Sequence, residues 1–166
     1  MNTPFSEIYD LFKDIIIKDT TFYIKNVTPE EIAQIAEIRM KKLLNRAIYY
    51  IVTVKDKKNF EIDFYNKDDT LSEFSFELIP VEKYLIANYM FYCYACEDRI
   101  IMWKSLNQRH FTDDEVKIVM NSPANSLKEF NNLTNGLKEE NEEKVKMYLR
   151  RDRETWKYKY FNWNLE

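Results

Sequence analysis

Two cysteines, in the order Cys93-Tyr94-Ala95-Cys96, have a spacing that can support metal or redox chemistry. The same spacing makes up half of many zinc sites and also occurs in dithiol redox pairs. A structural zinc site needs four ligands, however, and the chain has no other cysteine and one histidine. A redox pair normally lies beside a βαβ unit, which this sequence does not indicate. We therefore interpret both cysteines as small buried residues of a central helix, and we expect no metal and no cofactor.

The remaining candidates for chemistry are one histidine, an acidic triplet and one glycine. His110 has no nucleophile motif and no second histidine, so we interpret it as a surface or interface residue and not as a general base. The triplet Asp113-Asp114-Glu115 could bind a cation, but acidic residues after Thr112 are more simply a helix-start signal. Gly136 alone cannot build a glycine-rich loop that binds phosphate. We expect no catalytic residue, and we expect that the chain is not an enzyme.

A basic-aromatic segment, residues 150–163, differs in composition from the rest of the chain because cations are interleaved with aromatic residues. Such a segment can stack on bases and contact phosphates, can dock on an acidic grooved protein surface, or can fold back on its own domain. We hypothesise that it is an adhesive arm for a partner. The candidate partner-binding residues are Arg150, Arg151, Arg153, Trp156, Lys157, Tyr158, Tyr160, Phe161 and Trp163.

The overall composition is that of one domain with many aromatic residues. Of 166 residues, 45% are hydrophobic, 32% charged and 16% aromatic. Tyrosine is enriched at protein interfaces, although a tyrosine-rich core explains the excess equally well. A net charge of -3 selects neither nucleic acid nor membrane as a partner. No apolar run reaches the roughly 18 residues of a membrane-spanning helix, and the N-terminus lacks a signal-peptide pattern, so we expect a cytoplasmic protein.

Four prolines indicate where four helices begin, because proline is favoured at the first helical position. Helical spacing of apolar residues predicts helices over residues 4–17, from 29 to near 49, from 80 to about 106 and from 123 to about 153. Thr28-Pro29-Glu30-Glu31 has the form of a capping box. Thr3-Pro4 and Ser122-Pro123 also pair a capping hydroxyl with proline, whereas Ile79-Pro80 does not.

The last two expected helices differ in their apolar patterns. Residues 84–103 are apolar on nearly every side, which is typical of a helix at the centre of a bundle or at a subunit contact. The apolar stripe of the final helix lapses over residues 138–144, so we expect its middle to face solvent. There Glu140 with Lys144 and Glu142 with Lys146 form i,i+4 pairs. Gly136 could kink or divide this helix.

Between the second and third helices the apolar period changes from about 3.6 to 2. Residues 50–55, 60–65 and 74–78 alternate in polarity and are rich in β-branched and aromatic side chains, which is typical of strands. Residues 56–59 and 66–69 have the composition of turns. The alternation therefore predicts a small antiparallel meander, although an irregular arm could show the same alternation by chance.

These patterns predict a mainly α fold class. We expect a four-helix domain over residues 1–153, with a small antiparallel β meander inserted between helices 2 and 3 at about residues 49–79. Residues 154–166 would form an extended C-terminal arm.

Three segments, taken in order, resemble one family. They are Pro4-Phe5-Ser6-Glu7-Ile8-Tyr9-Asp10-Leu11-Phe12, the helix from Ile86 to Trp103, and Ser122-Pro123-Ala124-Asn125-Ser126-Leu127-Lys128-Glu129 leading into a helix that ends Tyr148-Leu149-Arg150-Arg151. Together they are similar to virion structural proteins of tailed bacteriophages that are placed in the neck as head-to-tail connectors or adaptors. The resemblance spans most of the chain and is weakest over residues 49–78.

The resemblance implies a mostly helical subunit repeated in a ring, commonly a dodecamer, beneath the portal protein. Such a ring joins the DNA-filled head to the tail or to other neck proteins, and DNA passes through its channel without specific binding. The implied location is the virion neck, with the host cytoplasm during assembly and no membrane. The basic-aromatic segment would then contact the portal or a neighbouring copy. The alternative from the residues themselves is a nucleic-acid-binding or regulatory helical protein that uses this segment.

Overall fold

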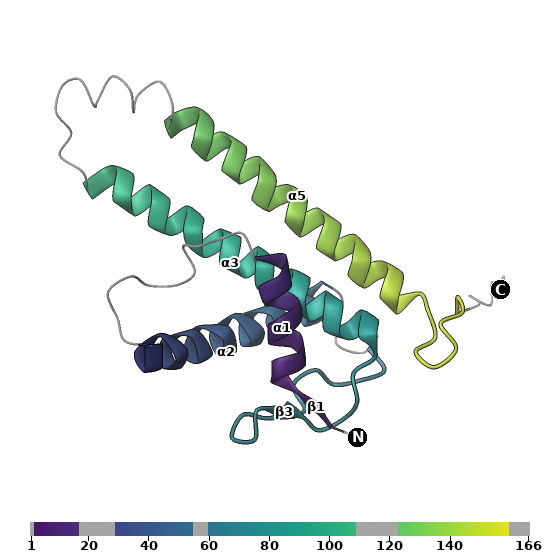
Figure 1. Ribbon diagram of the computed structural model, residues 1–166. Coiled ribbons are helices and arrows are strands. Elements are labelled where there is room, and N and C mark those ends of the chain that lie inside the picture. The colour runs from purple at the N-terminus through teal and green to yellow at the C-terminus, as the bar shows by residue number, and fades with distance from the viewer. Residues whose placement is uncertain (1, 17–28, 55–59, 109–122, 160–166) are drawn as a thin grey trace, which may run out of the picture.

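The computed structural model describes residues 2–16, 29–54, 60–108 and 123–159 (Figure 1). These residues form four helices: α1 (Phe5–Ile15), α2 (Pro29–Thr53), α3 (Pro80–Gln108) and α5 (Pro123–Leu149). They also form three short strands: β1 (Thr3–Pro4), β2 (Lys67–Asp68) and β3 (Glu73–Phe74). The expected mainly helical fold, with a small antiparallel sheet between the second and third helices, is confirmed.

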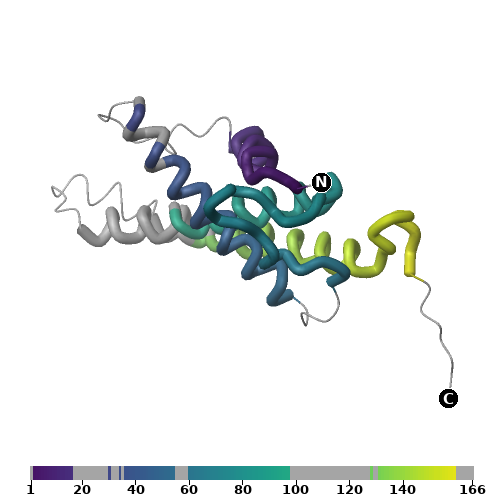
Figure 2. The backbone as a smooth tube through the Cα atoms, turned by 90° about the horizontal axis from the view of Figure 1, so that it is seen from below, coloured from purple at the N-terminus to yellow at the C-terminus, as the bar shows by residue number. Residues whose placement is uncertain are grey.

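Helix α3 lies at the centre of the fold. It packs against α1, α2 and α5, and Figures 1 and 2 show α5 running alongside it. Four consecutive residues of the helix, which point in four directions around its axis, are all buried: Tyr92, Cys93, Tyr94 and Ala95. Such all-round burial is what an apolar helix in a bundle centre requires, so this prediction is confirmed. Among the described residues, no helix has a stretch long and apolar enough to cross a membrane.

Helix α1 places one apolar face, made of Phe5, Ile8 and Phe12, in the core. The prediction that Thr3 caps this helix with Pro4 as its first residue is wrong. Pro4 is itself the N-cap, and no side chain caps the helix there. Thr3 lies in β1 instead, and its buried hydroxyl accepts a 2.8 Å hydrogen bond from the N–H of Leu78. Thr3 therefore pairs with a distant part of the chain, although the local sequence pattern predicts that it caps the helix.

Helix α2 begins at Pro29 as predicted, while Thr28 lies outside the described residues. The prediction that α2 ends near Tyr49 and is followed by a strand over residues 50–55 is wrong, because the helix continues to Thr53. Ile48, Ile51 and Val52 are buried, and their spacing is that of a helix face. Packing of this face outweighs the strand preference of the β-branched side chains.

Residues 60–65 form a loop and not the predicted strand. Asp63 organises it, because its carboxylate accepts the N–H of Tyr65 at 2.9 Å and its carbonyl accepts the N–H of Asn66 at 2.9 Å. Phe64 is fully buried, and Phe60 packs partly buried against the core. The alternation in the sequence therefore reflects which loop side chains reach the core, and it does not reflect pairing with a strand.

The sheet has the strand order β1-β3-β2, and both pairs are antiparallel. Thr3 is opposite Phe74 in one pair, and Lys67 is opposite Phe74 in the other. The N-terminus thus supplies an edge strand that the sequence did not indicate. The predicted turn at residues 66–69 was also misplaced, because β2 occupies residues 67–68 and the turn covers 69–72.

Helix α5 ends at Leu149, four residues before the predicted end, and continues through Gly136 as one helix. The prediction that its middle faces solvent is wrong at Asn141, which is buried and donates to the carbonyl of Asn88 at 3.3 Å. One buried stripe of the helix contains both polar and apolar residues: Thr134, Asn141, Val145 and Tyr148. The polar side chains of Thr134 and Asn141 thus lie on the same buried face as the apolar ones. Lys144 pairs with Glu140 at 2.7 Å as expected. Lys146 pairs with Glu143 instead of Glu142.

Candidate interaction site

Residues 150–159 fold into a C-terminal hairpin directly after α5. Asp152 N–H donates to the carbonyl of Lys157 and Lys159 N–H donates to the carbonyl of Arg150, both at 2.8 Å. The Asp152 carboxylate accepts the N–H and the hydroxyl of Thr155, at 2.8 and 2.7 Å. These bonds, the backbone N–H first, lower the pKa of Asp152, so the turn is held by an ionised carboxylate.

The hairpin is attached to the helices by the Glu82 cluster, which comprises Glu82, Tyr148, Arg153 and the backbone N–H of Ile79. Glu82 is fully buried near the start of α3. Its Oε1 accepts from the hydroxyl of Tyr148 at 2.6 Å and from Nε of Arg153 at 2.7 Å. Its Oε2 accepts from Ile79 N–H at 2.9 Å and from Nη2 of Arg153 at 3.1 Å. One carboxylate thus joins the start of α3, the end of α5 and the hairpin.

The protonation states in the Glu82 cluster make Tyr148 and Arg153 the donors and Glu82 the acceptor. Burial, and then the bond to Glu82, raise the pKa of Tyr148 above its ordinary value, so its hydroxyl remains a donor. The bond to Glu82 raises the pKa of Arg153. Arg153 also donates to the carbonyl of Glu77. A buried carboxylate is tolerated here because its two oxygens accept four hydrogen bonds from donors of the protein.

A groove of about 340 Å³ lies between α3, α5 and the hairpin. We call it the α3–α5 groove. Its lining is Val81, Tyr84, Leu85 and Asn88 from α3, Lys144, Met147 and Tyr148 from α5, and Arg151 and Trp156 from the hairpin. Tyr84 is 55% exposed and Met147 is 50% exposed. Aromatic residues, methionine and arginine are the types that interfaces favour, so the groove has the composition of a binding surface.

Arg151, which lines the groove, lies close to two aromatic rings. The carbon of its guanidinium lies 5.2 Å from the centre of the Trp156 ring and 4.4 Å from that of Tyr158. Its nitrogens donate to the carbonyl of Trp156 at 3.0 Å and to the hydroxyl of Tyr158 at 3.2 Å. Trp156 adopts a positive φ of 56°, which is uncommon outside glycine. The cation is therefore positioned by a turn that strains the backbone.

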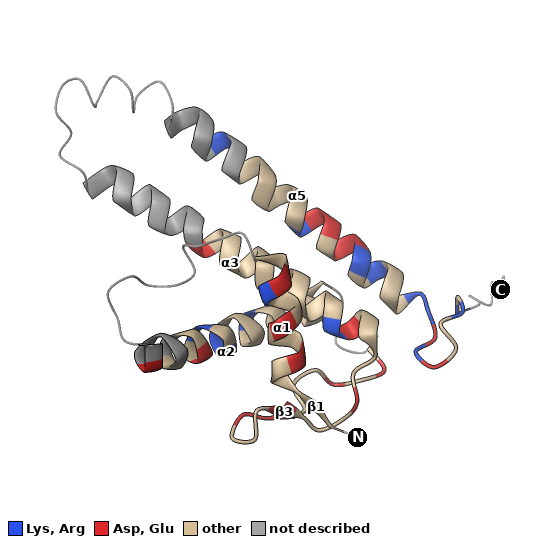
Figure 3. Cartoon of the chain, in the orientation of Figure 1, with Lys and Arg blue, Asp and Glu red and all other residues tan. Residues whose placement is uncertain are grey.

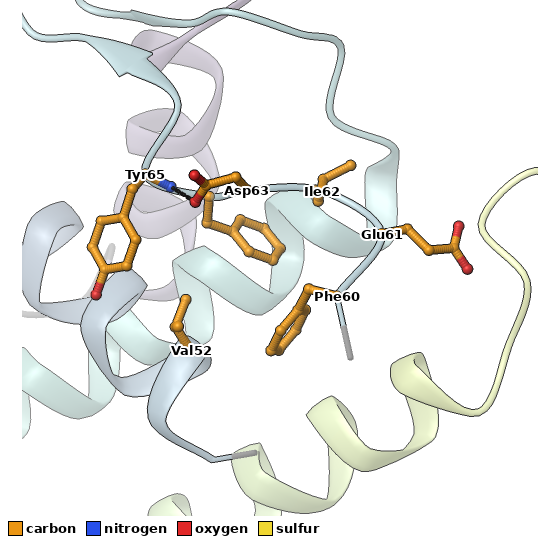
Figure 4. A pocket seen from close by; sticks show the side chains of 7 residues that line it. Val52, Phe60, Glu61, Ile62, Asp63 and Tyr65 are labelled. Carbon is orange, nitrogen blue, oxygen red and sulfur yellow. Dashed lines mark hydrogen bonds between the residues drawn. The ribbon is translucent and has the colours of Figure 1, made fainter. Parts of the chain in front are cut away.

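A second cavity, of about 410 Å³, is formed by Val52 and the loop of residues 60–65 (Figure 4). The carboxylate of Glu61 points away from Val52 and Phe60 in this view. Lys159 at the end of the hairpin forms an ion pair with Glu61. The ring of Phe60 lies 6.3 Å from that of Tyr148, so this loop also supports the end of α5.

The structure separates the nine predicted partner-binding residues. Arg151 and Trp156 line the groove, and Arg153 faces Glu82. Arg150, Lys157 and Tyr158 are exposed. Tyr160, Phe161 and Trp163 lie outside the described residues. The described part of the basic-aromatic segment folds back on its own domain, which was one of the three possibilities for it.

Sequence reasoning missed Glu82, although a signal for it exists. Glu82 is the third helical residue after the N-cap Ile79, and a glutamate at that position can accept the N-cap N–H. The sequence Ile79-Pro80-Val81-Glu82 therefore contains half of a capping box. Only the fold shows that Tyr148 and Arg153 share the same carboxylate.

Of the other candidates for metal or redox chemistry, the structure describes the two cysteines. Cys93 is fully buried on α3, as predicted, and Cys96 is partly buried. Burial raises the pKa of the Cys93 thiol to about 12, which disfavours the reactive thiolate. Within the described ranges, no three His, Cys, Asp or Glu side chains gather as a metal ion would require. His110 and the triplet at residues 113–115 lie outside the described residues.

Comparison of the chain with protein-family models, with curated proteins and with solved structures found no match.

Proposed function

We propose that the chain is a structural protein of a tailed-bacteriophage virion, a head-to-tail connector subunit of the adaptor type. Copies form a ring beneath the portal protein and join the DNA-filled head to the neck and tail. The subunit acts by assembly and not by catalysis, and DNA passes through the ring without specific binding. Its location is the virion neck, after assembly in the host cytoplasm.

The observation that supports this proposal most is the packing of the segments that resemble connector proteins. They fall in α1, α3 and α5, which are far apart in the sequence, and α3 packs against both other helices. Together with α2, which also packs against α3, they form one packed helical unit of the kind that the resemblance implies. The least similar residues, 49–78, fall in the end of α2, the loop and the sheet.

The α3–α5 groove is a second observation that supports a role in assembly. It exposes aromatic and apolar side chains, and such patches mark interaction surfaces in proteins of this size. The groove is the surface that we assign to the portal or to a neighbouring copy.

Nucleic-acid binding is the competing function, and the contacts of the hairpin favour it less. Arg153 forms an ion pair with Glu82, and the guanidinium of Arg151 lies close to the rings of Trp156 and Tyr158. Figure 3 shows acidic segments next to basic ones in the second half of α5, the helix whose Lys144 and Met147 line the groove. Acidic groups repel phosphates, so these side chains disfavour DNA binding at this surface.

The test is the mass of the purified chain in solution, alone and mixed with the portal protein encoded by the same genome. We expect a defined complex with the portal that persists when duplex DNA is added as a competitor. A chain that stays monomeric and ignores the portal overturns the proposal. Salt-dependent binding of duplex DNA by the isolated chain, without portal binding, would favour the competing function.

A chain ending at Arg153 gives a matched comparison, because it keeps the contacts of Arg153 with Glu82 and removes the rest of the hairpin. We expect weaker portal binding from this variant. Unchanged binding would place the partner contact elsewhere on the subunit.

A further inference from the structure

The turn between β2 and β3 presents the most exposed large apolar side chain among the described residues. Leu71 is 67% exposed there. The turn is nevertheless ordered, because the Asp68 carboxylate accepts the N–H groups of Thr70 and Leu71 at 2.7 and 2.9 Å. Ser72 has a φ of 56°, and its backbone carbonyl accepts a 2.8 Å hydrogen bond from the N–H of Phe5. A side chain held outward by a preformed turn loses little freedom on binding, which is what a docking contact needs.

The turn is also acidic around Leu71. Hydrogen bonds from the N–H groups of Leu71 and Thr70 lower the pKa of Asp68, so its carboxylate is ionised. Lys67 pairs with Asp69 at 2.5 Å, and Lys41 donates to the carbonyl of Asp69. In the described part of the chain, no ion pair involves Asp68. The charge of Lys41 also lowers the pKa of Asp68, so the turn offers an apolar side chain beside an ionised carboxylate that has no ion-pair partner among the described residues.

The α3–α5 groove has the complementary character. Val81, Leu85 and Met147 provide apolar lining, and Arg151 places a guanidinium at the edge. Lys144 is paired with Glu140, but no carboxylate of the described residues forms an ion pair with Arg151. The groove therefore offers an apolar surface beside an uncompensated positive charge, the converse of the turn.

The turn and the groove lie on different parts of the subunit. In Figure 1 the turn beside β3 projects at the lower left, whereas α5 and the hairpin that border the groove end at the right. One copy cannot bring them together. Two different complementary patches on one subunit form a head-to-tail contact between copies, which leads to rings or filaments.

We propose that copies of this chain bind one another head to tail, with Leu71 of one copy in the α3–α5 groove of the next and Asp68 beside Arg151. This inference rests on the proposed function, in which copies form a ring, and it names the two surfaces through which neighbouring copies meet. A second copy fits the groove better than DNA does, because the lining is largely apolar and Glu140 lies next to Lys144.

The test uses two single variants of the full chain, Leu71→Lys and Met147→Lys. Each places a charge on one side of the contact at an exposed position, so the fold is retained. Sedimentation velocity over a concentration series measures self-association. We expect each variant to weaken self-association at least tenfold. The matched control is Ile38→Lys, at a residue of α2 that is 58% exposed and outside both surfaces, which should associate as the unaltered chain does.

Mixing the two variants gives the sharpest readout. Leu71→Lys keeps an intact groove and Met147→Lys keeps an intact turn, so an equimolar mixture has one functional contact per pair. We expect dimers of one copy of each variant and nothing larger. A mixture that remains monomeric, or variants that associate like the unaltered chain, overturns the inference.

The outcome separates this inference from the proposed function. An unaltered chain that is monomeric at millimolar concentration but binds the portal overturns the inference and leaves the function standing. Loss of portal binding in Met147→Lys would then identify the portal as the occupant of the groove. Head-to-tail association without portal binding supports the inference and counts against the function.

Discussion

Glu82 is the residue whose replacement the structure predicts to be most costly. It is buried and accepts four hydrogen bonds from three parts of the chain. In Glu82→Gln an amide donor replaces one acceptor, which leaves Tyr148 or Arg153 facing another donor. We expect the free energy of unfolding to fall by about 1–3 kcal/mol, measured by urea denaturation followed by circular dichroism.

Glu61→Gln is the matched control, because Glu61 also pairs with a cation of the hairpin but its side chain is 39% exposed. An exposed pair contributes roughly 0–1 kcal/mol. If Glu82→Gln costs no more than Glu61→Gln, the Glu82 cluster does not hold the hairpin in place.

Cys93 offers a second test at the scale of single residues. Its thiol is buried with a pKa raised to about 12, so at pH 8 only roughly one thiol in ten thousand is ionised. We expect a thiol reagent at pH 8 to leave Cys93 unmodified in the native protein and to modify it in urea. Cys96→Ser isolates the signal of Cys93. Rapid native modification of that variant would contradict the packing of α3.

Single-residue roles could be predicted from sequence only where they depend on neighbours in the chain. The burial of Cys93 follows from the apolar run around it. The interleaving of cations with aromatic residues in the C-terminal segment was visible in the sequence, whereas the pairing of Arg151 with Trp156 and the ion pair of Arg153 with Glu82 were not. That ion pair depends on a carboxylate 71 positions away, which no local pattern connects to Arg153.

At the scale of elements, Gly136 is the clearest place to increase stability. It lies within α5, and a Cβ added there would meet nothing within 4 Å. Alanine restricts the unfolded chain and favours a helix over glycine by about 1 kcal/mol. We expect Gly136→Ala to raise the free energy of unfolding by about that amount, as measured in urea.

Gly136→Pro serves as the opposing variant, because proline inside a helix removes a hydrogen bond and clashes with the preceding turn, at a cost of about 3 kcal/mol. If both variants leave the stability of the protein unchanged, α5 does not fold cooperatively with the rest of the protein.

The sequence predicts an element correctly where the signals for it are local. Helices that begin at Pro29 and Pro80 were predicted because proline and apolar spacing are local signals. The end of α2 was not, because residues 49–53 satisfy both a period of 2 and a helical face, and only the packing of Ile51 decides between them. Strand β1 was missed because its partner, β3, is distant in the chain.

At the scale of the whole molecule, the buried ionisable groups make the fold sensitive to alkali. Burial raises the pKa of Tyr9 from 10.0 to about 12 and that of Cys93 from 9.0 to about 12. The unfolded chain therefore releases these protons at a lower pH than the native protein does. Their contribution to stability is complete below about pH 9 and is lost as the pH rises toward 12.

We expect the urea midpoint to decrease steadily between pH 9 and pH 11. Tyr9→Phe, which cannot ionise, should show a shallower decrease. A midpoint that does not change over this interval would mean that these side chains are equally accessible in the native and unfolded states.

The pairing of the N-terminal strand with a distant part of the chain has a consequence for biosynthesis. Thr3 finds its buried hydrogen-bond partner, Leu78, 75 positions later. At ordinary rates of translation, the ribosome needs roughly 4–15 s to make the intervening chain. During that interval α1 has neither its sheet nor α3 to cover its apolar face. We therefore expect the apolar face of α1 to stay accessible to chaperones until α3 emerges from the ribosome, and not to be covered when the first helix is complete.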